Sequence, residues 1–212
     1  MNFLQIIDLA GTFVFAVSGT LSAANKQRLD SFGVLFVAFV TAVGGGTTRD
    51  IILGIHPVVW VEDVRYFAII LLGVWLTLIY KQYIAPLKKT LFLFDSIGIG
   101  FFTILGMQKA LMIGVTPVIA IIMGMVSATV GGVLRDTLCN DLPLIFHREL
   151  YATACVAGAV LFLLLDALQV ENTLNMCLTI AVVILIRLLA VRYRIHLPTI
   201  ALEETAPEEE EG

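Results

Sequence analysis

Long apolar runs recur along the whole chain, and short polar connections separate them. Each run is long enough to form a helix that crosses the hydrocarbon core of a bilayer, which takes roughly 17 to 25 residues. The pattern predicts an all-α integral membrane protein with seven transmembrane helices, at Leu4–Ala23, Gly33–Ile55, Val64–Tyr80, Leu91–Ile113, Thr116–Cys139, Leu150–Gln169 and Thr173–Val191. We expect a single transmembrane domain over residues 1–197.

Composition agrees with this class. Of the 212 residues 59% are hydrophobic and 14% charged, and the mean hydropathy of +0.97 is far above that of soluble domains. The first run is not expected to be a signal peptide, because no basic residue precedes it and Asp8 interrupts it. Six of the 17 acidic residues lie in the Glu-rich segment 198–212, which we predict to be a disordered acidic tail. We expect no nucleic-acid partner, no metal site and no cofactor.

The distribution of basic residues predicts the orientation, because Lys and Arg collect on the cytoplasmic side of a membrane. With seven helices, one face carries the first, third and fifth connections and the C-terminus. The opposite face holds Arg65, with Lys109 near its border. The N-terminus is therefore predicted outside and the C-terminus in the cytoplasm of a bacterial or archaeal inner membrane. The basic residues of the cytoplasmic face are Lys26, Arg28, Lys81, Lys88, Lys89, Arg148, Arg192 and Arg194.

A short motif occurs twice, 86 residues apart. Gly44–Asp50 reads Gly-Gly-Gly-Thr-Thr-Arg-Asp, and Val130–Asp136 reads Val-Gly-Gly-Val-Leu-Arg-Asp, each followed by a proline, Pro57 or Pro143. Because each repeat has three helices, an odd number, the second copy enters the membrane from the other side. The sequence thus predicts two inverted three-helix repeats, about 4–80 and 91–169, followed by a seventh helix at about 173–191.

The glycines of the motif fall near the membrane midplane. Gly44, Gly45 and Gly46 weaken the second helix by roughly 1 kcal/mol each, and Gly131 and Gly132 do the same in the fifth. We predict a bend or an unwound turn that exposes carbonyl oxygens to a polar path. The alternative is that the glycines only aid helix packing. Hydroxyls that can help to replace the hydration shell of a monovalent cation lie nearby, at Thr41, Thr47, Thr48, Ser127 and Thr129.

The charged residues are the candidate pore charges or gate. Arg49 and Asp50 point about 100° apart on a helix, as do Arg135 and Asp136. We expect each arginine to reach an acid of the other repeat, either as a structural salt bridge or as an element of a gate.

Three further intramembrane charges are candidates, and a fourth is not. Asp8 and Asp95 lie near helix starts, where they either stabilise the helix dipole or attract cations. Lys109 either snorkels to the headgroups or acts as a gating charge. We expect Arg187 to lie at the inner interface rather than in a pore.

The seven predicted helices, the repeats and the motifs Gly44–Asp50 and Gly131–Asp136 together resemble the trimeric intracellular cation (TRIC) channel family, in its prokaryotic branch. That branch overlaps bacterial proteins labelled as probable glycine transporters. The resemblance implies a homotrimer in a lipid bilayer, with one pore per protomer between the repeats. It also implies conduction of potassium or another monovalent cation such as sodium.

The functions that remain are a passive potassium channel and, as the alternative, a carrier or exporter of a small zwitterion such as glycine. Loosened helices and free carbonyls can hold either one. The small mass of each repeat favours the channel, because a carrier must rock its repeats. The sequence shows no His-Glu-x-x-His and no nucleophile–base set, so we do not expect an enzyme.

Overall fold

The computed structural model describes residues 3–24, 26, 29–80, 87–146, 150–193 and 195. In this part of the chain all regular structure is helical, as the sequence predicts. The predicted tail at 198–212 lies outside the described residues. The elements are α1 (Phe3–Ala24), α2 (Ser31–Ile52), α3 (Val59–Glu62), α4 (Val64–Tyr80), α5 (Leu87–Met112), α6 (Pro117–Leu138), the 3-10 turn η1 (Leu144–Phe146), α7 (Ala152–Ala167) and α8 (Asn172–Tyr193).

Each predicted span coincides with one long helix, but the helices are not equally suited to cross a bilayer. Within the described residues five are long and apolar enough, namely α1, α2, α5, α6 and α8. The helices α4 and α7 are apolar but have only 17 and 16 residues. A multi-pass membrane protein is therefore clear, while the count of seven spans stays a prediction.

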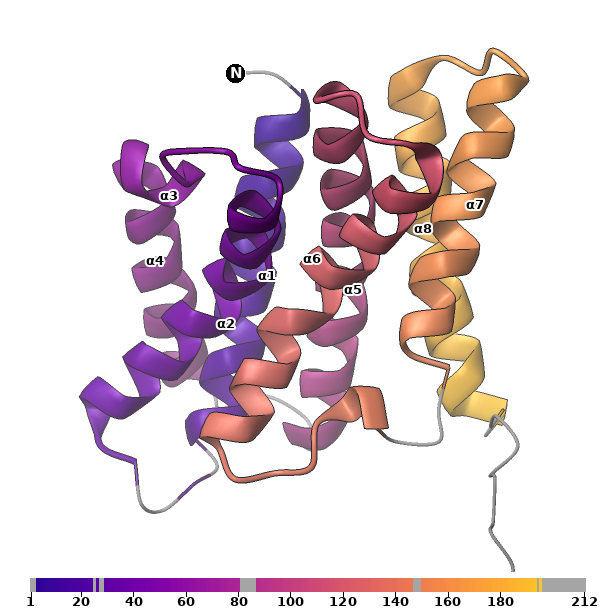
Figure 1. The fold of residues 1–212 in the computed structure, drawn as a ribbon. Helices are drawn as coiled ribbons and strands as arrows, with labels where there is room; N and C mark the ends of the chain where they lie inside the picture. Colours follow the sequence, from indigo (N-terminus) through magenta and orange to yellow (C-terminus); the bar gives the residue numbers. More distant parts are fainter. Residues whose placement is uncertain are drawn as a thin grey trace, which may run out of the picture.

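Two helices form the centre of the bundle (Figure 1). Helix α1 packs against α2 and α4, and α5 packs against α6, α7 and α8, while α1 and α5 also contact each other. The most apolar stretch of α1 is 83% buried and that of α5 is 61% buried, against 33–44% for α2, α6 and α8. The outer helices therefore present apolar surface to lipid, while α1 and α5 carry the core.

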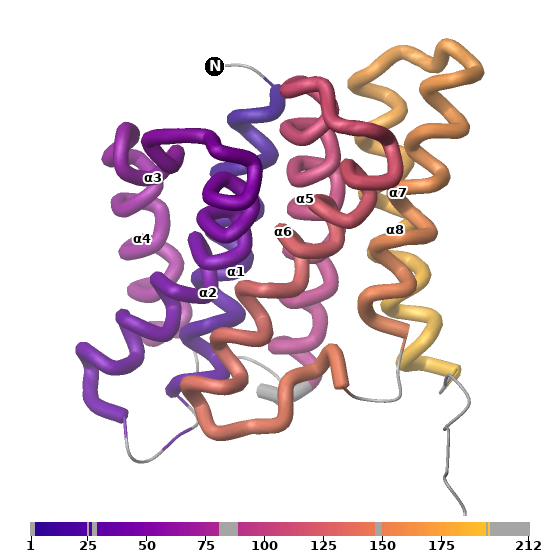
Figure 2. Tube along the Cα trace, in the orientation of Figure 1, coloured from indigo at the N-terminus to yellow at the C-terminus, as the bar shows by residue number. Residues whose placement is uncertain are grey.

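The helices of the two halves run in opposite directions. Followed by colour in Figure 2, α1 and α4 descend and α2 ascends, whereas α5 and α7 ascend and α6 descends. Helix α8 descends beside α7 at the edge of the bundle. The residues of α2 and α6 near the motif aspartates therefore lie at opposite ends of the molecule.

Helices α2 and α6 end in the same way. In α2 the amide of Leu53 donates to Arg49 O (3.0 Å) and that of Ile55 to Asp50 O (2.8 Å). In α6, 86 residues later, the amide of Cys139 donates to Arg135 O and that of Asp141 to Asp136 O, at the same two distances. Each pattern needs a left-handed residue after the helix, and Gly54 (φ 69°) and Asn140 (φ 54°) supply it. The residues that follow each copy of the motif therefore set where the helix stops in the same way.

Side-chain caps set the starts of α2 and α8. Asp30 accepts the amide of Gly33 at 2.7 Å and begins α2. Glu171 accepts the amides of Thr173 (2.9 Å) and Leu174 (2.7 Å) before α8. These backbone hydrogen bonds favour the charged form of Glu171 and lower its pKa.

Candidate functional site

The glycines of the motif bring α2 and α6 into backbone contact. A Cβ atom on Gly45 would overlap the carbonyl oxygen of Ser127, and one on Gly131 would overlap the carbonyl oxygen of Thr41. Both helices are continuous through these residues. Of the predicted bend or unwound turn, the unwound turn is therefore wrong, because both helices continue while the missing side chains permit a close crossing; the bend stays a prediction. The packing alternative describes these glycines correctly.

The next glycine of each motif faces a charged cluster. A Cβ on Gly132 would lie 2.8 Å from Tyr151 Oη and 3.5 Å from Asp95 Oδ1. A Cβ on Gly46 would lie at an ordinary 3.6 Å from Arg49 Nη2. The crossing of α2 and α6 thus lies between two groups of charged side chains. Each motif arginine is four residues, about 6 Å along the helix, from Gly45 or Gly131.

The first cluster consists of Asp8, Arg49, Asp50 and Lys109, at the end of the bundle where α1 begins. Arg49 is 1% exposed. Its Nε donates to Asp50 Oδ1 at 2.8 Å, and its Nη1 donates to Ser127 Oγ in the other half at 3.2 Å. The prediction that Arg49 reaches an acid of the other repeat is wrong. Consecutive residues can pair because the long arginine side chain folds back over its neighbour.

Asp8 and Lys109 complete the first cluster. Asp8 is the sixth residue of α1 and is buried. A helix dipole acts most strongly within the first turn of a helix, and Asp8 lies beyond that turn. Lys109 Nζ donates to Asp8 Oδ2 at 3.2 Å, and its side chain is 19% exposed. Lys109 therefore ends inside the protein on a carboxylate, and the prediction that it snorkels to the headgroups is wrong.

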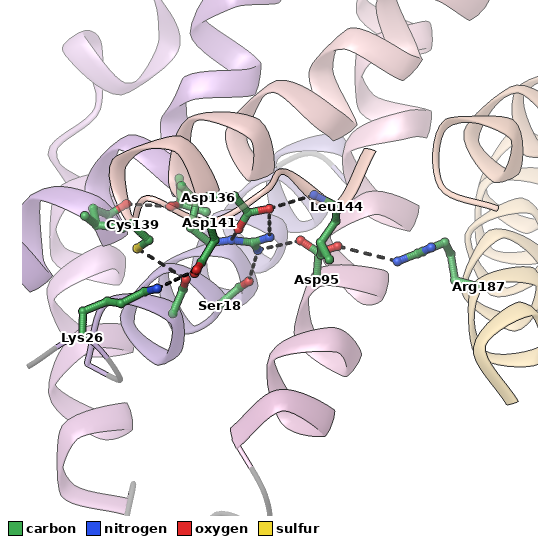
Figure 3. A network of polar contacts seen from close by, with 12 residues as sticks. Ser18, Lys26, Asp95, Asp136, Cys139, Asp141, Leu144 and Arg187 are labelled. Atoms are coloured by element: carbon green, nitrogen blue, oxygen red, sulfur yellow. Dashed lines mark hydrogen bonds and ion pairs between the residues drawn. The ribbon is translucent and has the colours of Figure 1, made fainter. Parts of the chain in front are cut away.

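The second cluster consists of Asp95, Arg135, Asp136 and Arg187, at the other end of the bundle. Figure 3 shows the polar contacts around Asp95, Asp136 and Arg187 from close by. Arg135 is fully buried. Its Nη1 donates to Asp95 Oδ1 and to Ser18 Oγ, both at 2.6 Å, and its Nε donates to Asp136 Oδ1 at 2.7 Å. As in the first cluster, the partner of the arginine in the other half is a serine. The acids that Arg135 contacts, Asp95 and Asp136, belong to its own half. Asp95 is the ninth residue of α5 and ion-pairs, so the dipole interpretation fails here too.

A small cavity adjoins the first cluster. It offers about 20 Å³ to the centre of a water-sized sphere, which is room for one or two waters. Trp60 of α3 covers part of it and donates from Nε1 to Thr47 Oγ1 at 3.0 Å. Phe102 lines the cavity and stacks on Phe15 with ring centroids 5.0 Å apart. The lining residues are Asp8, Thr12, Ala42, Val43, Gly46, Thr47, Arg49, Asp50, Val59, Trp60, Tyr66 and Phe102.

The predicted hydroxyls are not gathered around this cavity. Thr41, Thr48 and Thr129 each donate to the carbonyl oxygen four residues earlier in their own helix. Of the five predicted hydroxyl residues, only Thr47 lines the cavity. Ser127 lies at the crossing, where it accepts from Arg49.

A ladder of polar contacts joins α1 to the end of α6 beside the second cluster. Ser18, Ser22 and Lys26 follow one another at intervals of four residues. Ser18 accepts from Arg135, Ser22 Oγ contacts Cys139 Sγ at 3.4 Å, and Lys26 pairs with Asp141 at 2.6 Å (Figure 3). On this side of the crossing the two halves are therefore joined directly, whereas the cavity lies on the other side.

Sequence reasoning missed several residues in or beside the two clusters. Tyr66 lines the cavity, and Tyr151 lies beside Gly132. Their spacing of 85 residues, close to the repeat offset, was a usable signal. Arg187 is 1% exposed and lies 4.0 Å from Asp95 Oδ2, so its predicted place at the inner interface is wrong. Ser18 gave no signal in the sequence. Among the described residues no three His, Cys, Asp or Glu side chains gather as metal ligands.

Known proteins that are similar to this chain are also membrane proteins. A family model described as "Glycine transporter" matches residues 5–82 and 92–167. The UPF0126 inner membrane protein YadS of Escherichia coli is 38% identical over 204 residues, which are 93% of this chain and 96% of that protein.

Two solved structures are also similar. The TRIC trimeric intracellular cation channel orthologue from Rhodobacter sphaeroides has a TM-score of 0.86 and 35% identity, over 92% of this chain and all of that one. A second TRIC cation channel has a TM-score of 0.83 and 30% identity, over 96% and 99%.

The fold and the two buried charge clusters define a multi-pass helical membrane protein of the channel or transporter type. The chain belongs to the family described as "Glycine transporter", because its model matches more than half of the residues. The resemblance to prokaryotic TRIC channels is confirmed by the structural matches.

Proposed function

We propose that the protein is a passive channel for monovalent cations, potassium above all, with one pathway inside each protomer. The pathway runs between α1, α2, α5 and α6, from the cavity of the first cluster past the α2–α6 crossing to the second cluster. The observation that carries this proposal is the placement of the two clusters, one on each side of the glycine crossing and each about one helical turn from it.

The cavity has the chemistry of a cation entrance. Asp8 and Asp50, which pair with Lys109 and Arg49, supply carboxylates, and Thr12 and Thr47 supply hydroxyl oxygens. Oxygen atoms at close quarters can replace part of the hydration shell of a monovalent cation. Intramembrane charges are expensive, and in membrane proteins they mark ion pathways.

We infer that the described conformation is closed. Beyond the cavity, Phe102 stacks on Phe15, and Arg135 binds Ser18 of α1 and Asp95 of α5 at the same time. A cation that passes the crossing meets this fixed positive charge. Opening then requires that Arg135 release Asp95 and Ser18, so Arg135 acts in the gate as well as in the packing. We propose the same role for the other motif charges, Arg49, Asp50 and Asp136.

We also infer that α1, α2 and α4 form one repeat and that α5, α6 and α7 form its inverted copy. The opposite directions of the matching helices support this (Figure 2). So do the equal C-terminal hydrogen bonds of α2 and α6 and the two separate matches of one family model. Such repeats place a transport site near the midplane, at their interface.

We propose a homotrimer in the inner membrane, with the N-terminus outside and the C-terminus in the cytoplasm. The relative from Rhodobacter sphaeroides is named a trimeric channel, and the Escherichia coli relative is named an inner membrane protein. In this orientation the cavity of the first cluster faces outward, and the polar ladder of Ser18, Ser22 and Lys26 closes the cytoplasmic side.

The alternative is a carrier of a small zwitterion, which the family description suggests. Carboxylates and cations of the first cluster could pair with an ammonium and a carboxylate group. The small mass of each three-helix repeat favours the channel, however, because a carrier must rock its repeats against each other.

Reconstitution of the purified protein in a planar bilayer under a potassium chloride gradient separates the two functions. We expect stepwise unitary currents with a reversal potential near that of potassium. In vesicles that contain the same protein, we expect no saturable counterflow of radiolabelled glycine. Silence in the bilayer together with glycine counterflow would replace the channel with the carrier.

A further inference from the structure

Asp95 lies between two arginines but uses only one of its carboxylate oxygens. Oδ1 accepts from Arg135 at 2.6 Å. Oδ2 is buried, has no hydrogen-bond partner among the described residues, and lies 4.0 Å from Arg187 Nη2. The second arginine therefore stands just outside hydrogen-bond distance of the free oxygen.

Arg187 is held firmly in this position. Its Nη1 donates to the carbonyl oxygen of Leu150 at 2.9 Å. Its guanidinium lies over the rings of Phe92 and Tyr151, 4.7 and 4.6 Å from their centroids. Figure 3 shows the side chain of Arg187 reaching from α8 toward Asp95.

Two donors of Arg187 remain unused. Nε and Nη2 are buried and make no hydrogen bond within the described structure. Buried donors without partners are costly, so these two nitrogens would gain from a conformation that gives them a partner. Arg187 Nη2 lies 4.0 Å from Asp95 Oδ2. In a conformation where this distance is shorter by about 1 Å, Nη2 has a hydrogen-bond partner.

We propose that Arg187 is the alternate partner of Asp95, which takes over the carboxylate when Arg135 releases it. The exchange keeps Asp95 ionised and paired, so the gate opens without leaving an isolated charge in the membrane. Helix α8, which lies outside both inferred repeats, thereby controls the gate. This inference rests on the proposed function and names a positioning residue that does not itself line the pathway.

Single-channel recording of Arg187→Gln tests the exchange. We expect open probability to fall by about tenfold, the factor that corresponds to about 1.4 kcal/mol, while unitary conductance stays as in the wild type. The folded protein should lose some stability to unfolding in detergent, because the hydrogen bond to the Leu150 carbonyl oxygen and the two ring contacts are lost. Arg187→Lys keeps the positive charge but loses the planar guanidinium that lies over the two rings, so it should restore open probability only in part, to a value between those of Arg187→Gln and the wild type.

The matched control is Arg192→Gln, which removes the same charge at the exposed end of the same helix. It should leave open probability unchanged. The proposal is overturned if Arg187→Gln gates like the wild type, if Arg187→Lys is as impaired as Arg187→Gln, or if Arg192→Gln is equally impaired. A wild-type protein that carries no current would instead refute the proposed channel.

Discussion

Replacing Gly45 with alanine is expected to destabilise the protein by about 1–3 kcal/mol, the usual range for an overpacked contact. The new methyl group would overlap the carbonyl oxygen of Ser127, which is backbone and cannot turn aside. Helices α2 and α6 must therefore separate. The gain in helix propensity from glycine to alanine, about 1 kcal/mol, offsets only part of this. Chemical unfolding in mixed micelles measures the change.

Gly46→Ala is the matched control, one residue further along the same helix. Its methyl group would meet Arg49 Nη2 at 3.6 Å and Phe102 at 3.9 Å, which are ordinary contacts. We expect its stability to equal or exceed that of the wild type, by up to about 1 kcal/mol. If Gly45→Ala and Gly46→Ala unfold alike, the close crossing is not what these glycines provide.

The second large effect is expected at Asp95. Asp95→Asn leaves Arg135 and Arg187 buried. Among the described residues Arg135 then keeps its ion pair with Asp136, and Arg187 keeps none. Removing one partner of a buried ion pair costs about 3–5 kcal/mol, because the other charge remains without compensation. The same unfolding measurement in micelles should show a loss in this range.

Asp8→Asn provides the comparison, since it removes the corresponding acid of the first cluster. Its partner Lys109 is 19% exposed and has a flexible stem, so its ammonium can turn toward water or headgroups. We expect a loss of about 1 kcal/mol, as for a partly exposed ion pair. Equal losses for both variants would show that the two clusters do not differ in the way that their burial indicates.

The helices could be predicted from the sequence because hydrophobic length is a property of each segment alone. The duplicated motif was also sufficient to select the residues at the α2–α6 crossing. What it did not give was the conformation of the glycines, because glycine has the same low helix propensity whether a helix unwinds or packs closely. Only the position of Ser127 and Thr41 opposite Gly45 and Gly131 decides between the two.

The partners of the charges could not be predicted either. Arg49 bonds to Asp50 next to it, and Arg135 chooses Asp95 from α5 and Ser18 from α1. These choices depend on how far each side chain reaches across the packed helices, and no spacing in the sequence encodes that. Arg187 illustrates the limit: near a helix end it suggested an interface, yet it is 1% exposed and reaches Asp95.

The central claim is that cations pass through the protomer beside Thr47 and the α2–α6 crossing. Silver ions can test this pathway, because they resemble potassium in size and bind thiolates. The test channel carries Thr47→Cys in a background of Cys139→Ser and Cys155→Ala. The background retains Cys177, which lies exposed on α8 and serves as the control. We predict that silver added on the outer side reduces the unitary current of the Thr47→Cys channel by more than about half and leaves the background channel unchanged. A Thr47→Cys channel that conducts as before in silver would contradict the pathway.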